Sequence, residues 1–360
     1  MISRPDYVGR PRRLAVFRAL NLGDMLCSMP AFKALRAAFP RSHIALIGLP
    51  SCAPLVKRNR DCIDEFLPFP GDAALPEQPV QYAAIAAFHR GLSIRSIDIV
   101  LQMHGSGLHS NRIVRAMPAR RWAGFVPDPS MAQPGRLMPW PDDLPEAERY
   151  LALLRWLGMP ADVEAKPSFP LIQDDLEEAR DVMREHRLMA DRMVVVHPGA
   201  RLGSRRWPLL RYAQVAAALA RDGWQVAVTG DASERRLGEE LCDRAGAAVV
   251  DLSGHTSLGG LAALLQQSRL LICNDTGVSH VAAAVGARSV VIASGSDVRR
   301  WAPGDPQRHV VLHWDTPCRP CMHAECPYVH HPCARGISVE RVLAQAKRSL
   351  QESGHERTCI

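Results

Sequence analysis

The sequence lacks the features that mark a membrane-spanning or a disulfide-rich secreted protein. No uncharged stretch reaches the roughly 18 apolar residues that a membrane-spanning helix needs. The first twenty residues contain no clean apolar segment followed by a small-residue cleavage site, so no secretory signal is predicted. Ten cysteines in 360 residues are too few for a disulfide framework. These absences predict a cytoplasmic protein whose thiols are mostly reduced.

Aromatic residues and dinucleotide-binding glycines are scarce as well. Only 6% of the residues are aromatic, which disfavours a nucleic-acid binder that interleaves aromatic and basic side chains. No G-x-G-x-x-G motif follows a predicted strand, which argues against an NAD-dependent oxidoreductase. A hydrophobic fraction of 47% excludes a disordered chain, and a length of 360 residues favours two domains.

The net charge of +7 is distributed unevenly along the chain. Residues 1–140 contain 18 Lys and Arg against 9 Asp and Glu, whereas the remainder contains 26 against 28. A basic first half suits contact with nucleic acid, anionic lipid or a phosphorylated substrate. The alternative is an ordinary solvated surface in an arginine-rich protein, since 40 of the 44 basic residues are Arg.

Short apolar runs alternate with helical patterns along the whole chain, which predicts parallel βαβ units and an α/β fold. Strands are predicted at 14–17, 43–48, 98–102, 121–125, 193–197, 225–229, 247–251, 270–273 and 289–293. The segment 127–145 is predicted to be a loop. We divide the chain into an N-terminal tail (1–12), a first domain (13–165), a second domain (166–336) and a C-terminal helix (337–360). Ligands are expected beyond the carboxyl ends of the strands.

The first candidate site follows the first predicted strand, where Gly23 and Asp24 open a helix. The amino end of a helix stabilises the charged form of a carboxylate. Taken alone, this position favours Asp24 as an N-cap. The alternative is a general base that faces a ligand beyond the strand end.

Two further segments of the second domain suit an anion. In the HPGA turn after strand 193–197, Gly199 lets backbone amides approach a ligand. Arg205 and Arg206 precede a helix whose amino end is also positive, as a diphosphate site requires. The alternative is a pair of solvated arginines before a helix that begins at Pro208.

Polar residues also follow two other strands of the second domain. After strand 270–273, Thr276 and Gly277 offer a hydroxyl and backbone N–H groups to an anion, and Asp275 can accept hydrogen bonds from sugar hydroxyls. His280 lies one helical turn further on and is expected to line the same pocket. Glu234 follows strand 225–229 and suits a ribose or a base, the alternative being a helix cap formed with Asp231 or Ser233.

Four cysteines follow the last predicted strand with the spacing C-x2-C-x4-C-x6-C. They are Cys318, Cys321, Cys326 and Cys333. Such a set in a cytosolic protein is typical of zinc or an iron–sulfur cluster. The alternative, which we favour, is a structural loop of unligated thiols.

The order of these motifs resembles that of one enzyme family. A GD-x5-P motif (Gly23, Asp24, Pro30) is followed by HPGA, RRWP, G-x3-E, NDTG-x2-H and the cysteine-rich loop. This order is similar to glycosyltransferase family 9, the ADP-heptose:lipopolysaccharide heptosyltransferases, over about residues 14–350 and most strongly over 193–295. The resemblance implies the GT-B fold, two Rossmann-like, doubly wound domains that face each other across a cleft. It also implies that the first domain binds the acceptor, that the second binds the sugar nucleotide, and that the C-terminal helix crosses back to the first.

The resemblance assigns roles to individual residues. It implies that Asp24 is the catalytic base, with Gly23 beside it in the acceptor-side loop. It assigns donor binding to Gly199, Arg205, Glu234, Asp275, Thr276, Gly277 and His280. Arg205 stands where the family pattern has lysine, which keeps the charge but replaces a point donor with a planar fork.

The implied reaction is an inverting transfer in which Asp24 deprotonates an acceptor hydroxyl. No DxD motif is needed, so neither a metal nor another cofactor is expected in the chemistry, and structural zinc at the four cysteines is the alternative. The implied partners are a sugar-nucleotide donor such as ADP-heptose and a phosphorylated lipid or glycan acceptor such as the lipopolysaccharide core. Peripheral contact with the inner membrane and no contact with nucleic acid are expected. A family member with another donor or acceptor and a non-catalytic homologue are the competing hypotheses, and Asp24 argues against the second.

Overall fold

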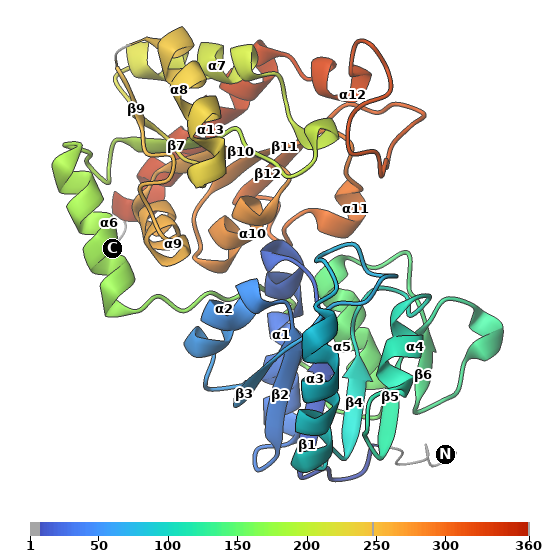
Figure 1. Ribbon diagram of the computed structural model, residues 1–360. Coiled ribbons are helices and arrows are strands. Elements are labelled where there is room, and N and C mark those ends of the chain that lie inside the picture. Colours follow the sequence, from blue (N-terminus) through green and yellow to red (C-terminus); the bar gives the residue numbers. More distant parts are fainter. Residues whose placement is uncertain (1–7, 247, 359–360) are drawn as a thin grey trace. The chain divides into compact units, whose positions relative to one another are not determined.

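The computed structural model describes residues 8–246 and 248–358, with side chains as far as Glu352. The chain divides into two compact units, Met1–Pro167 and Ser168–Ile360. Each unit contains a six-stranded parallel sheet with helices against its faces (Figure 1). The α/β class and the doubly wound plan predicted from the sequence are therefore confirmed.

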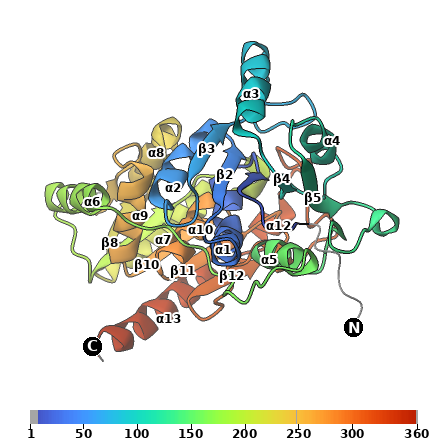
Figure 2. The same ribbon diagram turned by 90° about the horizontal axis from the view of Figure 1, so that it is seen from below.

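The first unit alternates strands and helices. Its strands are β1 Arg13–Phe17, β2 His43–Gly48, β3 Glu65–Pro68, β4 Ile99–Gln102, β5 Arg121–Val126 and β6 Leu137–Pro139. Its α-helices are α1 Leu22–Ala38, α2 Ala53–Arg58, α3 Tyr82–Arg95, α4 Ser110–Arg115 and α5 Glu146–Trp156, and short 3₁₀ turns are η1 Pro50–Cys52 and η2 Pro129–Met131. Helix α1 packs against α5, and α3 stands out from the sheet (Figure 2).

The second unit repeats the plan. Its strands are β7 Met193–His197, β8 Gln225–Val228, β9 Val249–Asp251, β10 Leu270–Asn274, β11 Ser289–Ala293 and β12 His309–His313. Its α-helices are α6 Gln173–Glu185, α7 Leu209–Arg221, α8 Arg235–Ala245, α9 Leu258–Gln267, α10 Gly277–Ala284, α11 Val298–Trp301, α12 Pro332–Arg335 and α13 Val339–Thr358. Two 3₁₀ turns, η3 Gly203–Arg205 and η4 Ala232–Glu234, follow β7 and β8.

The strand order is the same in both sheets and fixes where a ligand can bind. The first sheet runs β3-β2-β1-β4-β5-β6 and the second runs β9-β8-β7-β10-β11-β12. This is the Rossmann order, in which the winding direction reverses beside the first strand. The reversal leaves a crevice at the carboxyl ends of β1 and β4 in the first unit, and of β7 and β10 in the second. These are the topological switch points at which doubly wound folds bind ligands.

The central strands are buried on both faces, as parallel strands covered by helices must be. Strands β7 and β10 are buried along their whole length. Helix α13 completes this core, because its buried Val342, Ala346 and Leu350 join the cluster that contains Val194 and Ile272. The predicted crossing of the C-terminal helix to the first unit stays a prediction.

The structure departs from the expected elements in several places. The segment 127–145, predicted to be a loop, contains the edge strand β6, and β3, β12 and α6 were not predicted. Of the tail predicted at 1–12, residues 1–7 lie outside the described part, as does Ala247 of a predicted strand. Val8 is 1% exposed and its carbonyl accepts a hydrogen bond from Arg121, so the described end of this segment belongs to the first unit.

Within the described residues, none of the helices combines the length and the apolar character that crossing a bilayer demands.

Candidate active site

Asp24 lies at the switch point of the first unit, in the first turn of α1. Asn21 occupies the N-cap position and its side chain makes no capping hydrogen bond. The interpretation of Asp24 as the N-cap is therefore wrong. Gly23 is buried and Asp24 is half-buried, and the positive amino end of α1 stabilises a carboxylate there.

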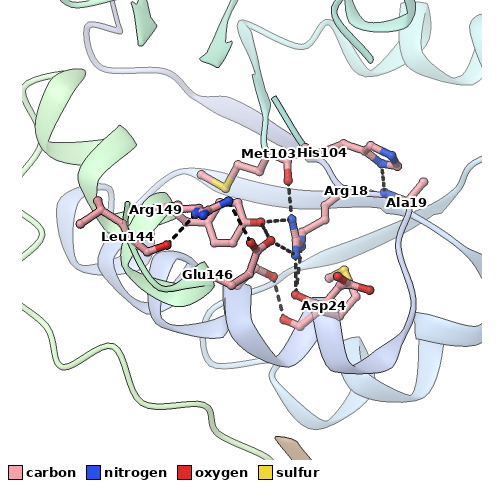
Figure 3. A network of polar contacts seen from close by, with 12 residues as sticks. Arg18, Ala19, Asp24, Met103, His104, Leu144, Glu146 and Arg149 are labelled. Carbon is pink, nitrogen blue, oxygen red and sulfur yellow. Dashed lines mark hydrogen bonds and ion pairs between the residues drawn. The ribbon is translucent and has the colours of Figure 1, made fainter. Parts of the chain in front are cut away.

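A buried arginine fixes the segment that carries Asp24 (Figure 3). Arg18 follows β1 and is 0% exposed. Its Nε and one terminal nitrogen both donate to the main-chain carbonyl of Asp24, at 3.1 and 2.7 Å. Its other N–H groups reach the Met103 carbonyl at 2.6 Å, the Tyr150 hydroxyl at 2.5 Å and the Glu146 carboxylate at 3.3 Å. All five donors of the guanidinium are satisfied, and the chain at Asp24 is tied to β4 and α5.

The same network contains three buried charged side chains, Arg18, Glu146 and Arg149. The Glu146 carboxylate accepts a hydrogen bond from Tyr150 and pairs with Arg149 at 3.7 Å. Burial acts to lower the pKa of Arg18, but Tyr150, Glu146 and Asp24 raise it above its ordinary value. Arg18 therefore stays a cation although it is buried. Arg18 was not predicted from the sequence, because a lone arginine after a strand gives no indication that it is buried.

His197 and Glu234 meet at the switch point of the second unit. His197 ends β7, and its Nδ1 lies 3.1 Å from Thr229 Oγ1 while its Nε2 lies 3.7 Å from Glu234 Oε2. Burial lowers the pKa of His197 to about 4, so its ring is neutral at pH 7. A side chain at Gly199 would collide with the Glu234 carboxylate. Glycine is thus required for this carboxylate to lie against the HPGA turn.

Glu234 also takes part in a helix cap, the alternative considered from the sequence. Asp231 accepts hydrogen bonds from the N–H groups of Ser233 at 2.7 Å and Glu234 at 3.2 Å, and Glu234 Oε2 accepts from the Asp231 N–H at 3.1 Å. Burial raises the pKa of Glu234. The cap uses Oε2, whereas Oε1 lies nearest the position that a Gly199 side chain would take.

Asn274 joins the donor-side motifs and was given no role from the sequence. It ends β10 and is 0% exposed. Its Oδ1 accepts from the Trp207 N–H at 2.9 Å, and its Nδ2 donates to the carbonyls of Pro198 at 2.7 Å and Gly199 at 3.2 Å. A polar amide at the end of an otherwise apolar strand was the signal that could have identified it.

The segment after Asn274 begins helix α10 without a side-chain cap. Thr276 is the N-cap of α10, yet its hydroxyl makes no capping hydrogen bond. Its carbonyl instead accepts from the N–H and Oγ of Ser279, at 3.0 and 2.7 Å. Gly277 begins the helix, and the Asp275 N–H is held by the Ile292 carbonyl at 3.1 Å. The hydroxyl and amides at this helix start suit an anion.

His280 lies deeper in the second unit. It is 5% exposed and its ring meets that of Trp301 edge-on at 6.1 Å. This is a packed histidine, and the described contacts leave its predicted role toward the donor untested.

A family model described as glycosyltransferase family 9 (heptosyltransferase) matches residues 85–331, more than half of the chain. The chain belongs to glycosyltransferase family 9. It is therefore a glycosyltransferase, as the order of its motifs predicted.

Relatives of this family 9 chain cover nearly its whole length. Lipopolysaccharide heptosyltransferase 2 of Salmonella typhimurium is 25% identical over 348 residues, which are 92% of this chain and 97% of that protein. The solved structure of a family 9 glycosyltransferase from Veillonella parvula has a TM-score of 0.78 at 20% identity and covers 95% of this chain and 98% of its own. The structure of E. coli ADP-heptose lps heptosyltransferase II has a TM-score of 0.69 at 20% identity, with coverage of 95% and 99%. The two structural likenesses show the GT-B fold.

Arg205, the departure from the family 9 lysine, lies half-buried on η3 beside the cysteine loop. It donates to the Cys321 carbonyl at 2.9 Å. Burial lowers the pKa of Arg205, and the charge of Asp275 raises it. The loop also contacts the neighbouring Ser204. The Ser204 N–H donates to the Ala324 carbonyl, and the Ser204 hydroxyl donates to the His323 carbonyl. The position of the cysteine loop against Arg205 was not predicted from the sequence.

The four cysteines of this loop are free thiols. Burial raises the pKa of Cys333, and the neighbouring Cys318, Cys321 and Cys326 raise it further. Over residues 8–246 and 248–352, no three His, Cys, Asp or Glu side chains are arranged to hold a metal ion.

Proposed function

We propose that the chain transfers a heptose from ADP-heptose to the core of lipopolysaccharide, with inversion at the anomeric carbon. Two relatives matched over nearly their full length, lipopolysaccharide heptosyltransferase 2 and ADP-heptose lps heptosyltransferase II, support this substrate pair. The observation that carries the proposal is the placement of the family motifs. Asp24 follows β1, while Glu234, Asp275 and Thr276 follow β8 and β10, all at carboxyl ends beside the switch points.

In the proposed reaction the first unit binds the acceptor and Asp24 takes the proton of its hydroxyl. The hydroxyl oxygen then forms a bond to the anomeric carbon of the heptose, and the bond from that carbon to the diphosphate breaks. The electron pair leaves with ADP. The base contributes because the oxygen becomes a stronger nucleophile as it loses its proton.

The second unit would bind the donor through the start of α10 and through Arg205. Thr276 and Gly277 offer a hydroxyl and N–H groups to the diphosphate, and Arg205 adds a guanidinium. These groups stabilise the negative charge that grows on the leaving diphosphate. Glu234 would bind the nucleoside, and Gly199, Asp275 and His280 would line the same site.

The acceptor side of the proposal includes the inner face of the cell membrane. A phosphorylated lipid acceptor explains why residues 1–140 carry an excess of basic side chains. We propose that the chain is cytoplasmic and touches this membrane peripherally. Sedimentation with vesicles of anionic phospholipid, lost at high salt, is the expected result.

Thr276→Val should weaken ADP binding. The variant keeps the shape of the residue and removes one hydroxyl, so calorimetry should show a loss of about 1–3 kcal/mol in binding free energy. Ser257→Ala, which removes the cap of α9 in the same unit, is the control and should leave ADP affinity unchanged. Equal affinity of Thr276→Val and the wild type would contradict the diphosphate site at α10.

Arg205→Ala should weaken ADP binding by a similar amount, because a charge-assisted hydrogen bond is lost. Arg205→Lys restores the family residue and should recover most of the affinity. If the alanine variant binds ADP as tightly as the wild type, Arg205 serves only to hold the Cys321 carbonyl.

The proposed chemistry uses no metal, and we expect the cysteine loop to be metal-free. Protein purified without a metal-affinity step should contain zinc and iron well below one equivalent by elemental analysis. Transfer should continue in the presence of a chelator. One equivalent of zinc, lost together with stability on chelation, would show instead that the four thiolates form a closed structural site.

The donor itself is tested with a panel of sugar nucleotides. ADP-heptose should raise the melting temperature more than GDP- or UDP-linked sugars do, since a ligand stabilises the state that binds it. A larger shift with another sugar nucleotide would identify a family 9 enzyme with a different donor. No shift with any of them would favour a non-catalytic homologue.

A further inference from the structure

His104 occupies the second strand of the first switch point and has no role in the reaction described so far. It follows β4, whose neighbour is β1, so it stands at the crevice to which Asp24 also belongs. The Arg18 guanidinium spans the two sides, because it binds the carbonyls of Asp24 and of Met103, the residue before His104. Arg18 therefore ties together the two segments that carry the Asp24 carboxylate and the His104 imidazole (Figure 3).

The orientation of the His104 ring is fixed from three directions. Its Nδ1 accepts a hydrogen bond from the Ala19 N–H at 3.2 Å. Its face stacks on Phe17 with ring centroids 5.5 Å apart and an interplanar angle of 20°. Its main-chain carbonyl accepts from Gln102 Nε2 at 2.6 Å and Ser110 Oγ at 2.7 Å. A ring held by its backbone, its face and one nitrogen can act only through its remaining edge.

The hydrogen bond from Ala19 also determines the protonation of the ring. A nitrogen that accepts from a backbone N–H carries no proton, so the proton of the neutral imidazole lies on Nε2. Burial and, to a smaller extent, the positive charge of Arg18 lower the pKa of His104 to about 3. The ring is therefore a neutral donor at pH 7 and cannot serve as the base.

The edge of the His104 ring that carries Nε2 is the part that can contact a ligand. His104 is 7% exposed, and within the described residues no hydrogen-bond partner is recorded for Nε2. A neutral donor suits a site next to a base, because a cation at the same place would stabilise the carboxylate and make Asp24 a weaker proton acceptor.

We propose that His104 is an acceptor-binding residue whose Nε2–H donates a hydrogen bond to an oxygen of the acceptor glycan held beside Asp24. This inference rests on the proposed function, since it takes the first unit as the acceptor site. It adds a residue that binds the acceptor without exchanging a proton.

Two amide substitutions separate the two ring nitrogens. The amide of Asn reaches the position of Nδ1, so His104→Asn keeps a partner for the Ala19 N–H and loses the outward donor. The longer Gln places its NH₂ near Nε2 and keeps that donor. With the deacylated core of heptose-deficient lipopolysaccharide as acceptor, the KM for acceptor should rise about tenfold in His104→Asn. It should stay within about threefold of the wild type in His104→Gln.

The other readouts exclude a merely structural role. The KM for ADP-heptose and the acidic limb of the pH profile should not move in either variant. His109→Asn changes an exposed histidine at the start of α4 and should match the wild type throughout. An unchanged acceptor KM in His104→Asn, or an equal rise in His104→Gln, would overturn the proposal.

The failure of the proposed function would be seen separately. If the wild-type chain transfers no sugar to this acceptor, direct binding of the same oligosaccharide, measured by calorimetry on wild type and His104→Asn, still tests the role of His104. Weaker binding by His104→Asn than by His104→Gln supports it, and equal binding by the three proteins overturns it.

Discussion

Asp24→Asn should lower kcat for sugar transfer by about 10²–10⁴-fold, the usual contribution of a general base. The amide is nearly isosteric with the carboxylate and cannot accept the proton of the acceptor hydroxyl. The main-chain carbonyl at Asp24 still accepts both hydrogen bonds from Arg18, so the fold should be unaffected. ADP affinity should also be unchanged, because the proposed donor residues belong to the second unit.

The matched control for this variant is Asp128→Asn. Asp128 is an aspartate of the same unit that caps η2 and lies outside the switch point. Both variants should melt at nearly the wild-type temperature, and only Asp24→Asn should lose turnover. Near wild-type turnover in Asp24→Asn would mean that Asp24 is not the base.

Arg18→Met should lower the free energy of unfolding of the first unit by about 3–5 kcal/mol, because it leaves a buried carboxylate without its main partner. Glu146 is 1% exposed, and its 3.7 Å ion pair with Arg149 remains in the variant. The carbonyls of Asp24 and Met103 lose the hydrogen bonds from Arg18 at the same time. Urea unfolding followed by circular dichroism, supported by calorimetry of the two units, measures the effect.

Two further substitutions test whether the loss of stability in Arg18→Met comes from the buried network. Arg90→Met removes an exposed arginine of α3 and should change stability by less than about 0.5 kcal/mol. Arg18→Lys keeps the charge but not the five-donor fork, so it should recover only part of the loss. If Arg18→Met is as stable as Arg90→Met, the buried network does not hold the segment that carries Asp24.

The strands that were predicted well from the sequence are those that are completely buried. Strands such as Met193–His197 and Ser289–Ala293 are nearly continuous apolar runs and are buried along their whole length. Strands β3 and β6 are short, contain Pro68 and Pro139 and lie at the sheet edges, where part of their surface stays exposed. Edge strands carry less of the hydrophobic pattern on which prediction depends.

The positions of the candidate site residues could be predicted where a motif places them after a strand. Asp24, Thr276 and Glu234 belong to this group. Arg18 and Asn274 were missed because their roles come from partners far along the chain, such as Tyr150 and Trp207. The spacing of residues within one segment does not predict contacts with residues that are distant in the sequence. The position of the cysteine loop against Arg205 was missed for the same reason.

The most direct test of the account is the product of the reaction itself. The purified chain is incubated with ADP-heptose and heptose-deficient lipopolysaccharide, in the presence of a chelator. Mass spectrometry should show an acceptor heavier by one heptose, formed in step with ADP, and NMR should show the inverted anomeric configuration. Release of ADP without a heavier acceptor, or retention of configuration, would contradict the account.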